Sequence, residues 1–186
     1  MCYGMSANNL PPASAVVRML RDNGITSVRL YALDSAALAA LGGTGISVMV
    51  GVPNNVFPGL ATSAPAAAAW VRTNIQAHPA VSFQYLVVGN EVAGGDTRFV
   101  VPAMENVHSA LAAAGLGGAI NVTTSISQAT TAVHVPPSAG EFTNESKPSL
   151  LPVLPFLERT GAPLLPNLYP YFVYTYKAAA LVEKGP

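Results

Sequence analysis

Asn90 and Glu91 are the residues whose types and position best suit chemistry in this 186-residue chain. They follow the apolar run of residues 83–88 and Gly89, which we expect to form a strand covered on both faces. Enzymes with parallel sheets keep their chemistry at the carboxyl ends of such strands, where a carboxyl group can transfer a proton. Because side chains alternate along a strand, Glu91 should share a face with Val87, and Asn90 should point to the other face. An isolated Asn-Glu pair can also simply open a loop.

The other predicted strands also end in polar or aromatic residues, which makes the loop interpretation less attractive. The strands are expected at residues 1–4, 27–31, 46–52, 83–88, 119–125 and 164–169. The residues at their carboxyl ends are Tyr31, Asn54, Asn55, Asn90, Glu91, Ser125 and Tyr169. In parallel strands these side chains would gather on one rim of the sheet.

Helical patterns separate the strands, at residues 12–23, 34–41, 63–75, 102–115 and 150–160. Residues 128–143 contain prolines and no periodicity, and we expect a loop there. Strict alternation of strands and helices predicts an α/β fold with parallel pairing. The clustering on one rim favours an incomplete (β/α)8 barrel with about six of its eight βα units, formed by residues 1–186 as a single domain. An open doubly wound sheet is the structural alternative.

A glycine cluster at Gly42, Gly43 and Gly45 invites comparison with a dinucleotide-binding loop. Such a loop follows a strand and opens a helix, whereas these glycines precede the strand at residues 46–52. A nucleotide-dependent oxidoreductase is therefore only a remote alternative.

Composition narrows the class of partner. Nine basic and nine acidic residues give a formal net charge of +0, so no basic surface for nucleic acid is expected. One cysteine and three scattered histidines predict neither a disulfide nor a metal site. No apolar run is long enough to suggest a membrane span. A secretory leader, if one exists, would have been removed or lie outside this chain, and the sequons at Asn121 and Asn144 would suit secretion.

Several motifs resemble plant endo-1,3-β-glucanases of glycoside hydrolase family 17, in the right order and at fitting separations. They are Cys2-Tyr3-Gly4-Met5, Asn8-Asn9-Leu10-Pro11, Arg29-Leu30-Tyr31, Gly89-Asn90-Glu91-Val92, Pro102-Ala103-Met104, Gly161-Ala162-Pro163-Leu164-Leu165 and Pro166-Asn167-Leu168-Tyr169-Pro170-Tyr171-Phe172. The resemblance implies a (β/α)8 barrel that hydrolyses β-1,3-glucan (callose or fungal-wall glucan) with retention of configuration. It implies a monomer without a cofactor, secreted to the cell wall or held in the vacuole.

The resemblance also assigns roles to particular residues. Glu91 matches the proton donor, and Asn90 matches the amide that hydrogen-bonds the sugar 2-hydroxyl. Tyr31, Tyr169 and Phe172 match rim aromatics that bind sugar or orient the nucleophile, although core packing explains Phe172 equally well. Protonation by Glu91 suits the reaction, because a glycosidic oxygen leaves readily only when it is protonated.

A second carboxylate, about 5–5.5 Å from the acid, is required for retaining hydrolysis. The family carries it in a Glu-Ser-Gly-Trp type motif after the seventh strand, and this sequence has no such motif. We therefore expect a truncated barrel in which the acid/base is present and the nucleophile is missing, with little hydrolysis and marginal stability. The alternatives are a catalytically dead fragment that binds β-glucan and a fragment that binds nothing.

Overall fold

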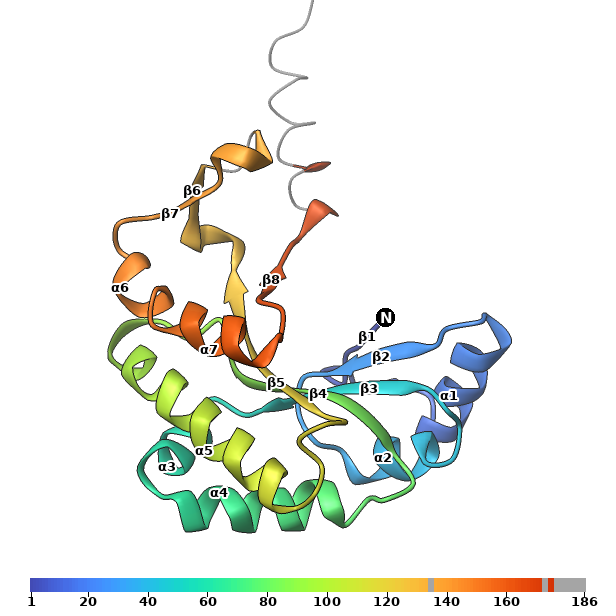
Figure 1. The fold of residues 1–186 in the computed structure, drawn as a ribbon. Helices are drawn as coiled ribbons and strands as arrows, with labels where there is room; N and C mark the ends of the chain where they lie inside the picture. Colours follow the sequence, from blue (N-terminus) through green and yellow to red (C-terminus); the bar gives the residue numbers. More distant parts are fainter. Residues whose placement is uncertain (134–135, 172–173, 176–186) are drawn as a thin grey trace, which may run out of the picture.

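The computed structural model describes residues 1–133, 136–171 and 174–175, and its centre is a curled sheet of parallel strands (Figure 1). The strands of this sheet stand in the order β1 (Cys2–Tyr3), β2 (Ser27–Leu30), β3 (Ser47–Val52), β4 (Ser82–Asn90), β5 (Asn121–Ser127) and β8 (Leu165–Asn167). Sequential order without a reversal excludes the doubly wound alternative, which needs a switch point.

Helices follow the strands and pack along the outside of the curled sheet (Figure 1). The α-helices are α1 (Ala13–Asp22), α2 (Ser35–Leu41), α3 (Phe57–Thr62), α4 (Ala64–Val71), α5 (Val100–Ala113), α6 (Lys147–Leu150) and α7 (Val153–Thr160). A π-turn, η1 (Arg72–Gln76), extends α4, and the 3₁₀ turns are η2 (Gly94–Phe99), η3 (Gln128–Thr130) and η4 (Pro137–Ala139). The predicted α/β class and the incomplete (β/α)8 barrel are confirmed.

Local sequence explains where the helices begin and end. The side chains of Asp34 and Ser63 each accept a hydrogen bond from a backbone N–H in the first turn of α2 and α4. Gly161 ends α7 in the left-handed conformation, with φ of 69°. Pro102 lies within the first turn of α5, where a helix requires no N–H donor, so the helix begins at Val100 rather than at the proline.

Three features differ from the sequence-based expectation. Helix α3 occupies residues 57–62, for which sequence analysis predicted no element. The helix predicted at residues 150–160 begins later, at Val153 of α7 after Pro152, and a separate short helix, α6, precedes it. The predicted loop at residues 128–143 contains the antiparallel pair β6 (Thr131–Val133) and β7 (Glu141–Phe142).

The core lies between the sheet and its helices. Leu30, Val50 and Leu86 of the strands are fully buried and pack in the same cluster as Phe57 and Met104 from the helices. Trp70 of α4 is partly buried and packs against this cluster. Strands β1 and β8 form the two edges of the sheet.

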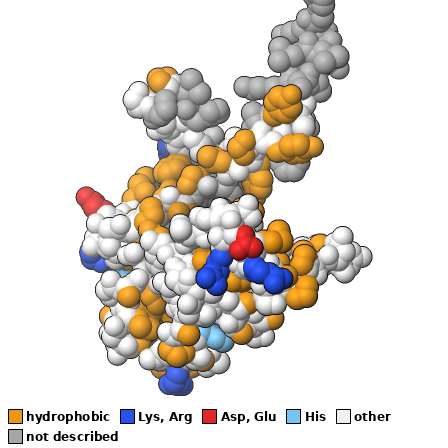
Figure 2. Space-filling model, turned by 90° about the vertical axis from the view of Figure 1, so that its right-hand side faces the viewer, with side chains coloured by type: hydrophobic (Ala, Val, Ile, Leu, Met, Phe, Trp, Pro, Cys, Tyr) orange, Lys and Arg blue, Asp and Glu red, His pale blue; other side chains and the backbone are white. Residues whose placement is uncertain are grey.

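Surface charge is sparse. In the view of Figure 2 the basic side chains stand singly or in a small group beside an acidic one rather than in a broad patch. No helix among the described residues combines the length and apolar character that crossing a bilayer requires.

Candidate active site

A cluster of polar side chains occupies the carboxyl ends of four strands that are far apart in the sequence. Arg29 comes from β2, Asn90 from β4, Ser125 from β5 and Asn167 from β8. Glu91 follows Asn90 directly, and Tyr169 follows β8. The curl of the sheet brings these strand ends together, so residues separated by up to 138 positions form direct hydrogen bonds.

The backbone around Glu91 departs from regular strand geometry. Gly89 has φ of 79° and Glu91 has φ of 52°, the latter in the left-handed region that residues with a side chain rarely adopt. The pairing of β4 with β5 shifts register between Val87 and Asn90. Because of this irregularity the expected alternation is wrong: Asn90 and Glu91 both contact the side-chain amide of Asn167.

Glu91 is partly buried, and its carboxylate accepts hydrogen bonds from two donors. Its Oε1 accepts hydrogen bonds from Asn167 Nδ2 at 2.5 Å and from the Tyr169 hydroxyl at 2.9 Å. The bond to Glu91 is the main reason that the pKa of Tyr169 is raised, because ionisation of the phenol would destroy the hydrogen bond and place two negative charges together.

Asn90 is fixed through both its backbone and its side chain. Its N–H donates to Asn54 Oδ1 at 2.8 Å, and its carbonyl accepts from Asn54 Nδ2 at 2.9 Å. Its own Oδ1 accepts from Arg29 at 2.8 Å and from Asn167 Nδ2 at 3.1 Å. The polar loop residue Asn54 therefore serves to hold the end of β4.

Tyr31 lies at the rim, 44% exposed, with the Arg29 guanidinium 4.5 Å from its ring centroid. Contact between a cation and an aromatic face is favourable and limits the orientations of both groups. A hydrogen bond with the Cys2 thiol is the largest of the causes that raise the pKa of Tyr31. Tyr169 is similarly exposed, at 46%, so both predicted rim tyrosines remain accessible.

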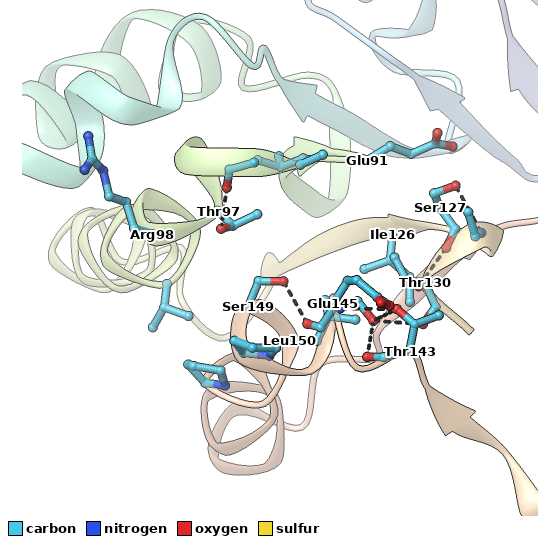
Figure 3. A pocket seen from close by; sticks show the side chains of 18 of the residues that line it. Glu91, Thr97, Arg98, Ile126, Ser127, Thr130, Thr143, Glu145, Ser149 and Leu150 are labelled. Atoms are coloured by element: carbon cyan, nitrogen blue, oxygen red, sulfur yellow. Dashed lines mark hydrogen bonds between the residues drawn. The ribbon is translucent and has the colours of Figure 1, made fainter. Parts of the chain in front are cut away.

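A groove of about 890 Å³ adjoins the cluster and has Glu91 in its lining (Figure 3). One wall is the turn η2 with Thr97 and Arg98, and the other is formed by residues around the β6–β7 pair and α6. The Glu91 carboxylate points away from Thr97 and Arg98 (Figure 3). It therefore stands at one end of the groove and faces the polar cluster.

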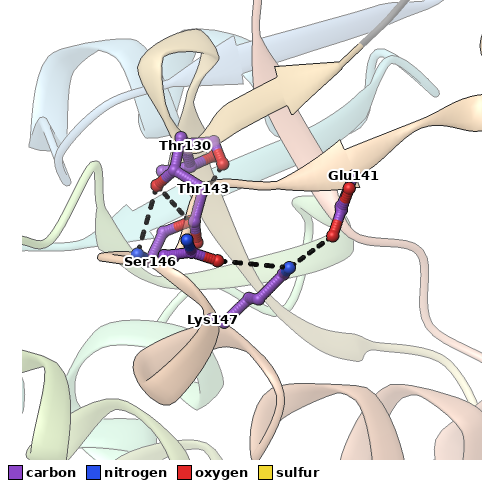
Figure 4. Close-up of polar contacts among 6 residues, drawn as sticks. Thr130, Glu141, Thr143, Ser146 and Lys147 are labelled. Atoms are coloured by element: carbon purple, nitrogen blue, oxygen red, sulfur yellow. Dashed lines mark hydrogen bonds and ion pairs between the residues drawn. The ribbon is translucent and has the colours of Figure 1, made fainter.

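The second wall is stabilised by its own polar contacts (Figure 4). The Ser146 hydroxyl donates to the carbonyl of Thr130 at 2.9 Å and lies 3.0 Å from the Thr143 hydroxyl. Lys147 forms an ion pair with Glu141 of β7. These bonds tie Thr130 and β7 to the start of α6.

The structure thus unites most of the predicted site residues: Tyr31, Asn90, Glu91 and Tyr169. Phe172 lies outside the described residues. Sequence analysis assigned no role to Arg29 or Asn167, although one is a charged residue and the other an amide within strands that are otherwise largely apolar. That contrast is the signal that could have identified them. Within residues 1–133, 136–171 and 174–175, no group of three or more His, Cys, Asp or Glu side chains could hold a metal ion.

Comparison with known proteins places this geometry among plant glucan hydrolases. A protein of Hordeum vulgare named Lichenase-2 is 61% identical over 97% of this chain and 58% of its own length. A glucan endo-1,3-beta-glucosidase of Zea mays, the acidic isoform, is 46% identical over 97% of this chain and 53% of its own. A solved structure from a study of two plant beta-glucan endohydrolases with distinct substrate specificities superposes with a TM-score of 0.91 at 62% identity, covering 96% of this chain and 58% of that one.

The chain spans a little over half the length of these relatives. The family model described as glycosyl hydrolases family 17 matches residues 1–182, which is nearly the whole chain. On the strength of that match and of the identities above, this chain belongs to glycosyl hydrolase family 17.

Proposed function

We propose that this chain forms the acid/base side of an active site that hydrolyses β-1,3-glucan with retention of configuration. The observation that carries the proposal is the Glu91 carboxylate, held at the carboxyl ends of the strands beside a groove. The Zea mays relative is a glucan endo-1,3-beta-glucosidase by name, which supports the same substrate. We further propose that the chain is a single, secreted catalytic domain and acts as a monomer.

Glu91 would be the proton donor. Among the described residues, both hydrogen bonds to its carboxylate, from Asn167 and Tyr169, are accepted by Oε1. When the carboxyl group is protonated, the proton therefore belongs on Oε2, which remains available to the glycosidic oxygen. Transfer of this proton to the leaving oxygen would allow the bond to the anomeric carbon to break, and the carboxylate could then activate water.

Asn90 would bind the sugar next to the bond that breaks. Its Oδ1 already accepts two hydrogen bonds, whereas its Nδ2 donates none within the part of the chain that the structure describes. An amide nitrogen in this position can donate to a sugar hydroxyl, and such bonds to the 2-hydroxyl strengthen in the transition state of glycoside hydrolysis. Tyr31 and Tyr169 would contact the sugar rings from the rim, and Phe172 remains a candidate for the same role.

A retaining mechanism also needs a second carboxylate beside the acid. Around Glu91, none of the hydrogen-bonding partners in the described residues is another acid. Glu145 also lines the groove, but it is an exposed residue on the loop after β7. We propose that this chain does not itself supply the nucleophile, so it would bind glucan and cleave it slowly or not at all.

Laminarin, a soluble β-1,3-glucan, tests the proposal. Laminarin in the gel should slow the migration of the purified 186-residue chain in affinity electrophoresis. The chain should release few reducing ends from laminarin. Asn90→Ala should weaken binding about ten-fold, the value of one good hydrogen bond to the sugar, whereas Asn23→Ala at the exposed end of α1 should not. Steady hydrolysis abolished by Glu91→Gln would show that a nucleophile is present, and absence of binding would leave an inert fragment.

Lichenan, a mixed-linkage β-glucan, is a second candidate substrate. The relative named Lichenase-2 is 61% identical, whereas the named glucan endo-1,3-beta-glucosidases of Zea mays and Hordeum vulgare range from 43% to 48%. Parallel affinity measurements on laminarin and lichenan would decide between the two polymers. Tighter binding of lichenan would redirect the proposal to mixed-linkage glucan without changing the role of Glu91.

A further inference from the structure

Arg29 carries the positive charge of the polar cluster and donates hydrogen bonds to three of its members. Its Nη1 donates to Asn167 Oδ1 at 2.7 Å, and its Nη2 donates to Asn90 Oδ1 at 2.8 Å and to the Ser125 hydroxyl at 3.2 Å. The side chain is partly buried. Its planar guanidinium therefore faces two amides and a hydroxyl, all of them electrically neutral.

The chemistry of the guanidinium fixes which atom each amide presents to it. An asparagine amide carries an acceptor and a donor that are nearly equal in size, so its orientation depends on its partners. Arg29 can only donate hydrogen bonds. The amide atoms next to it must therefore be the oxygens of Asn90 and Asn167.

Two consequences follow for the site. With its oxygen toward Arg29, Asn167 presents Nδ2 to Glu91 Oε1 and Asn90 Oδ1. With its oxygen toward Arg29, Asn90 keeps Nδ2 for a ligand. If the Asn167 amide were reversed, it would present an oxygen to the Glu91 carboxylate. If the Asn90 amide were reversed, it would present an acceptor rather than a donor to the ligand.

We propose that Arg29 is a positioning residue that sets the orientation of both amides and thereby locates the Glu91 carboxyl group and the Asn90 donor. Its importance for catalysis rests on the proposed function, whereas its effect on the amides does not. Arg29 itself is held by the pairing of β2 with β3 and by the Tyr31 ring, 4.5 Å from the guanidinium carbon.

Ser125 is the competing explanation, because its hydroxyl also donates to Asn167 Oδ1, at 2.9 Å. A hydroxyl can donate or accept, so it can adapt to either orientation of the amide. Ser125 receives a hydrogen bond from Arg29, which leaves its own proton for Asn167. The direction of the hydrogen bond from Ser125 to Asn167 is therefore set by Arg29.

The test measures how much the chemical shifts of the Asn167 side-chain amide change when Glu91 is replaced. The signals are recorded in NMR spectra of the ¹⁵N-asparagine-labelled chain. Glu91→Gln should shift the Asn167 amide protons in the wild-type background. In the Arg29→Met background the same replacement should shift them by less than half as much, because the amide is no longer held. Arg29→Lys keeps a donor-only group and should restore most of the effect, and Ser125→Ala should leave most of it intact.

An equal shift in the wild-type and Arg29→Met backgrounds would overturn the proposal, as would loss of the effect in Ser125→Ala alone. If Arg29→Met does not fold, Arg29→Gln replaces it, since glutamine can accept as well as donate and should also reduce the shift. These spectra require neither hydrolysis nor glucan. Failure of laminarin binding would therefore count against the proposed function while leaving the positioning role to be decided by NMR.

Discussion

At the scale of single residues, the site depends on groups that can form hydrogen bonds in only one sense. A guanidinium only donates and an ionised carboxylate only accepts, so the Asn167 amide between Arg29 and Glu91 has one satisfactory orientation. Tyr169 completes the arrangement as a second donor to Glu91. The geometry of the acid is therefore determined by its neighbours on other strands.

Replacement of Glu91 should be visible in the titration of Tyr169. The carboxylate raises the pKa of this phenol above 10.0, so Glu91→Gln should bring that pKa down toward its ordinary value. Because the folded-state pKa is raised, this hydrogen bond favours folding below pH 10 and ceases to do so as the pH rises through the raised value. NMR titration of ¹³C-tyrosine-labelled chain measures the change. Glu105→Gln, on the outer helix α5, is the control and should have no effect.

Gly89 should be intolerant of a side chain. Its φ is 79°, and a Cβ atom there would lie 2.6 Å from Val92 Cγ2. Gly89→Ala should cost about 1–3 kcal/mol and displace Glu91, because the backbone must leave this conformation. Gly59→Ala, in the exposed part of α3 with nothing within 4 Å, should be neutral or stabilising by up to about 1 kcal/mol. Urea denaturation compares the two, and equal effects would contradict the strain assigned to Gly89.

At the scale of elements, contacts between helices that follow different strands hold the outside of the sheet in place. Asn106 of α5 reaches α3, where its Nδ2 donates to the carbonyls of Leu60 at 2.7 Å and Ala61 at 3.1 Å. These carbonyls belong to the last turn of α3, which leaves them without partners in the helix itself. The short helix α3, which sequence analysis did not predict, is thus held in place by hydrogen bonds from α5.

Asn106→Ala should therefore destabilise the chain by about 1–3 kcal/mol, since partly buried carbonyls would lose their donor. Asn74→Ala is the matched control. Its Nδ2 donates to Trp70, one turn earlier in the same helical segment, so its loss should cost less. Chemical denaturation monitored by the fluorescence of the single tryptophan gives both values. A larger effect for Asn74 would argue that α3 does not depend on this contact.

At the scale of the whole molecule, one core supports an open sheet. Strands β1 and β8 are edges, so the interior side of the curl is covered by the polar cluster rather than by a complete ring of strands. The hydrogen bond from Arg29 on β2 to Asn167 on β8 spans that interior. Stability must then come largely from the layer between the sheet and the helices.

Met104 tests this view of the core. It is fully buried on the inner face of α5, and Met104→Ala should cost about 2–5 kcal/mol, a large part of the stability of a typical domain. Met19 is 57% exposed on α1, and Met19→Ala should change stability by no more than about 0.5 kcal/mol. The two midpoints in urea check the prediction. Similar values would mean that the helix layer is loosely packed.

The sequence by itself determined the order of strands and helices, because apolar periodicity, helix caps such as Asp34 and stops such as Gly161 act over a few residues. It also placed Glu91 and Asn90 at the end of a strand and, through its motifs, indicated the family. It did not reveal α3 or the β6–β7 pair, because those short elements depend on contacts with distant segments.

Only the tertiary structure decided how the site is assembled. Regular alternation along β4 predicted that the Asn90 and Glu91 side chains lie on opposite faces of the strand. The positive φ angles at Gly89 and Glu91 instead turn both side chains toward Asn167. The curl of the sheet then brings Arg29 within hydrogen-bonding distance of residues more than sixty positions away. Local patterns cannot specify such contacts, because they arise from sheet curvature and from the mutual satisfaction of donors and acceptors on separate strands.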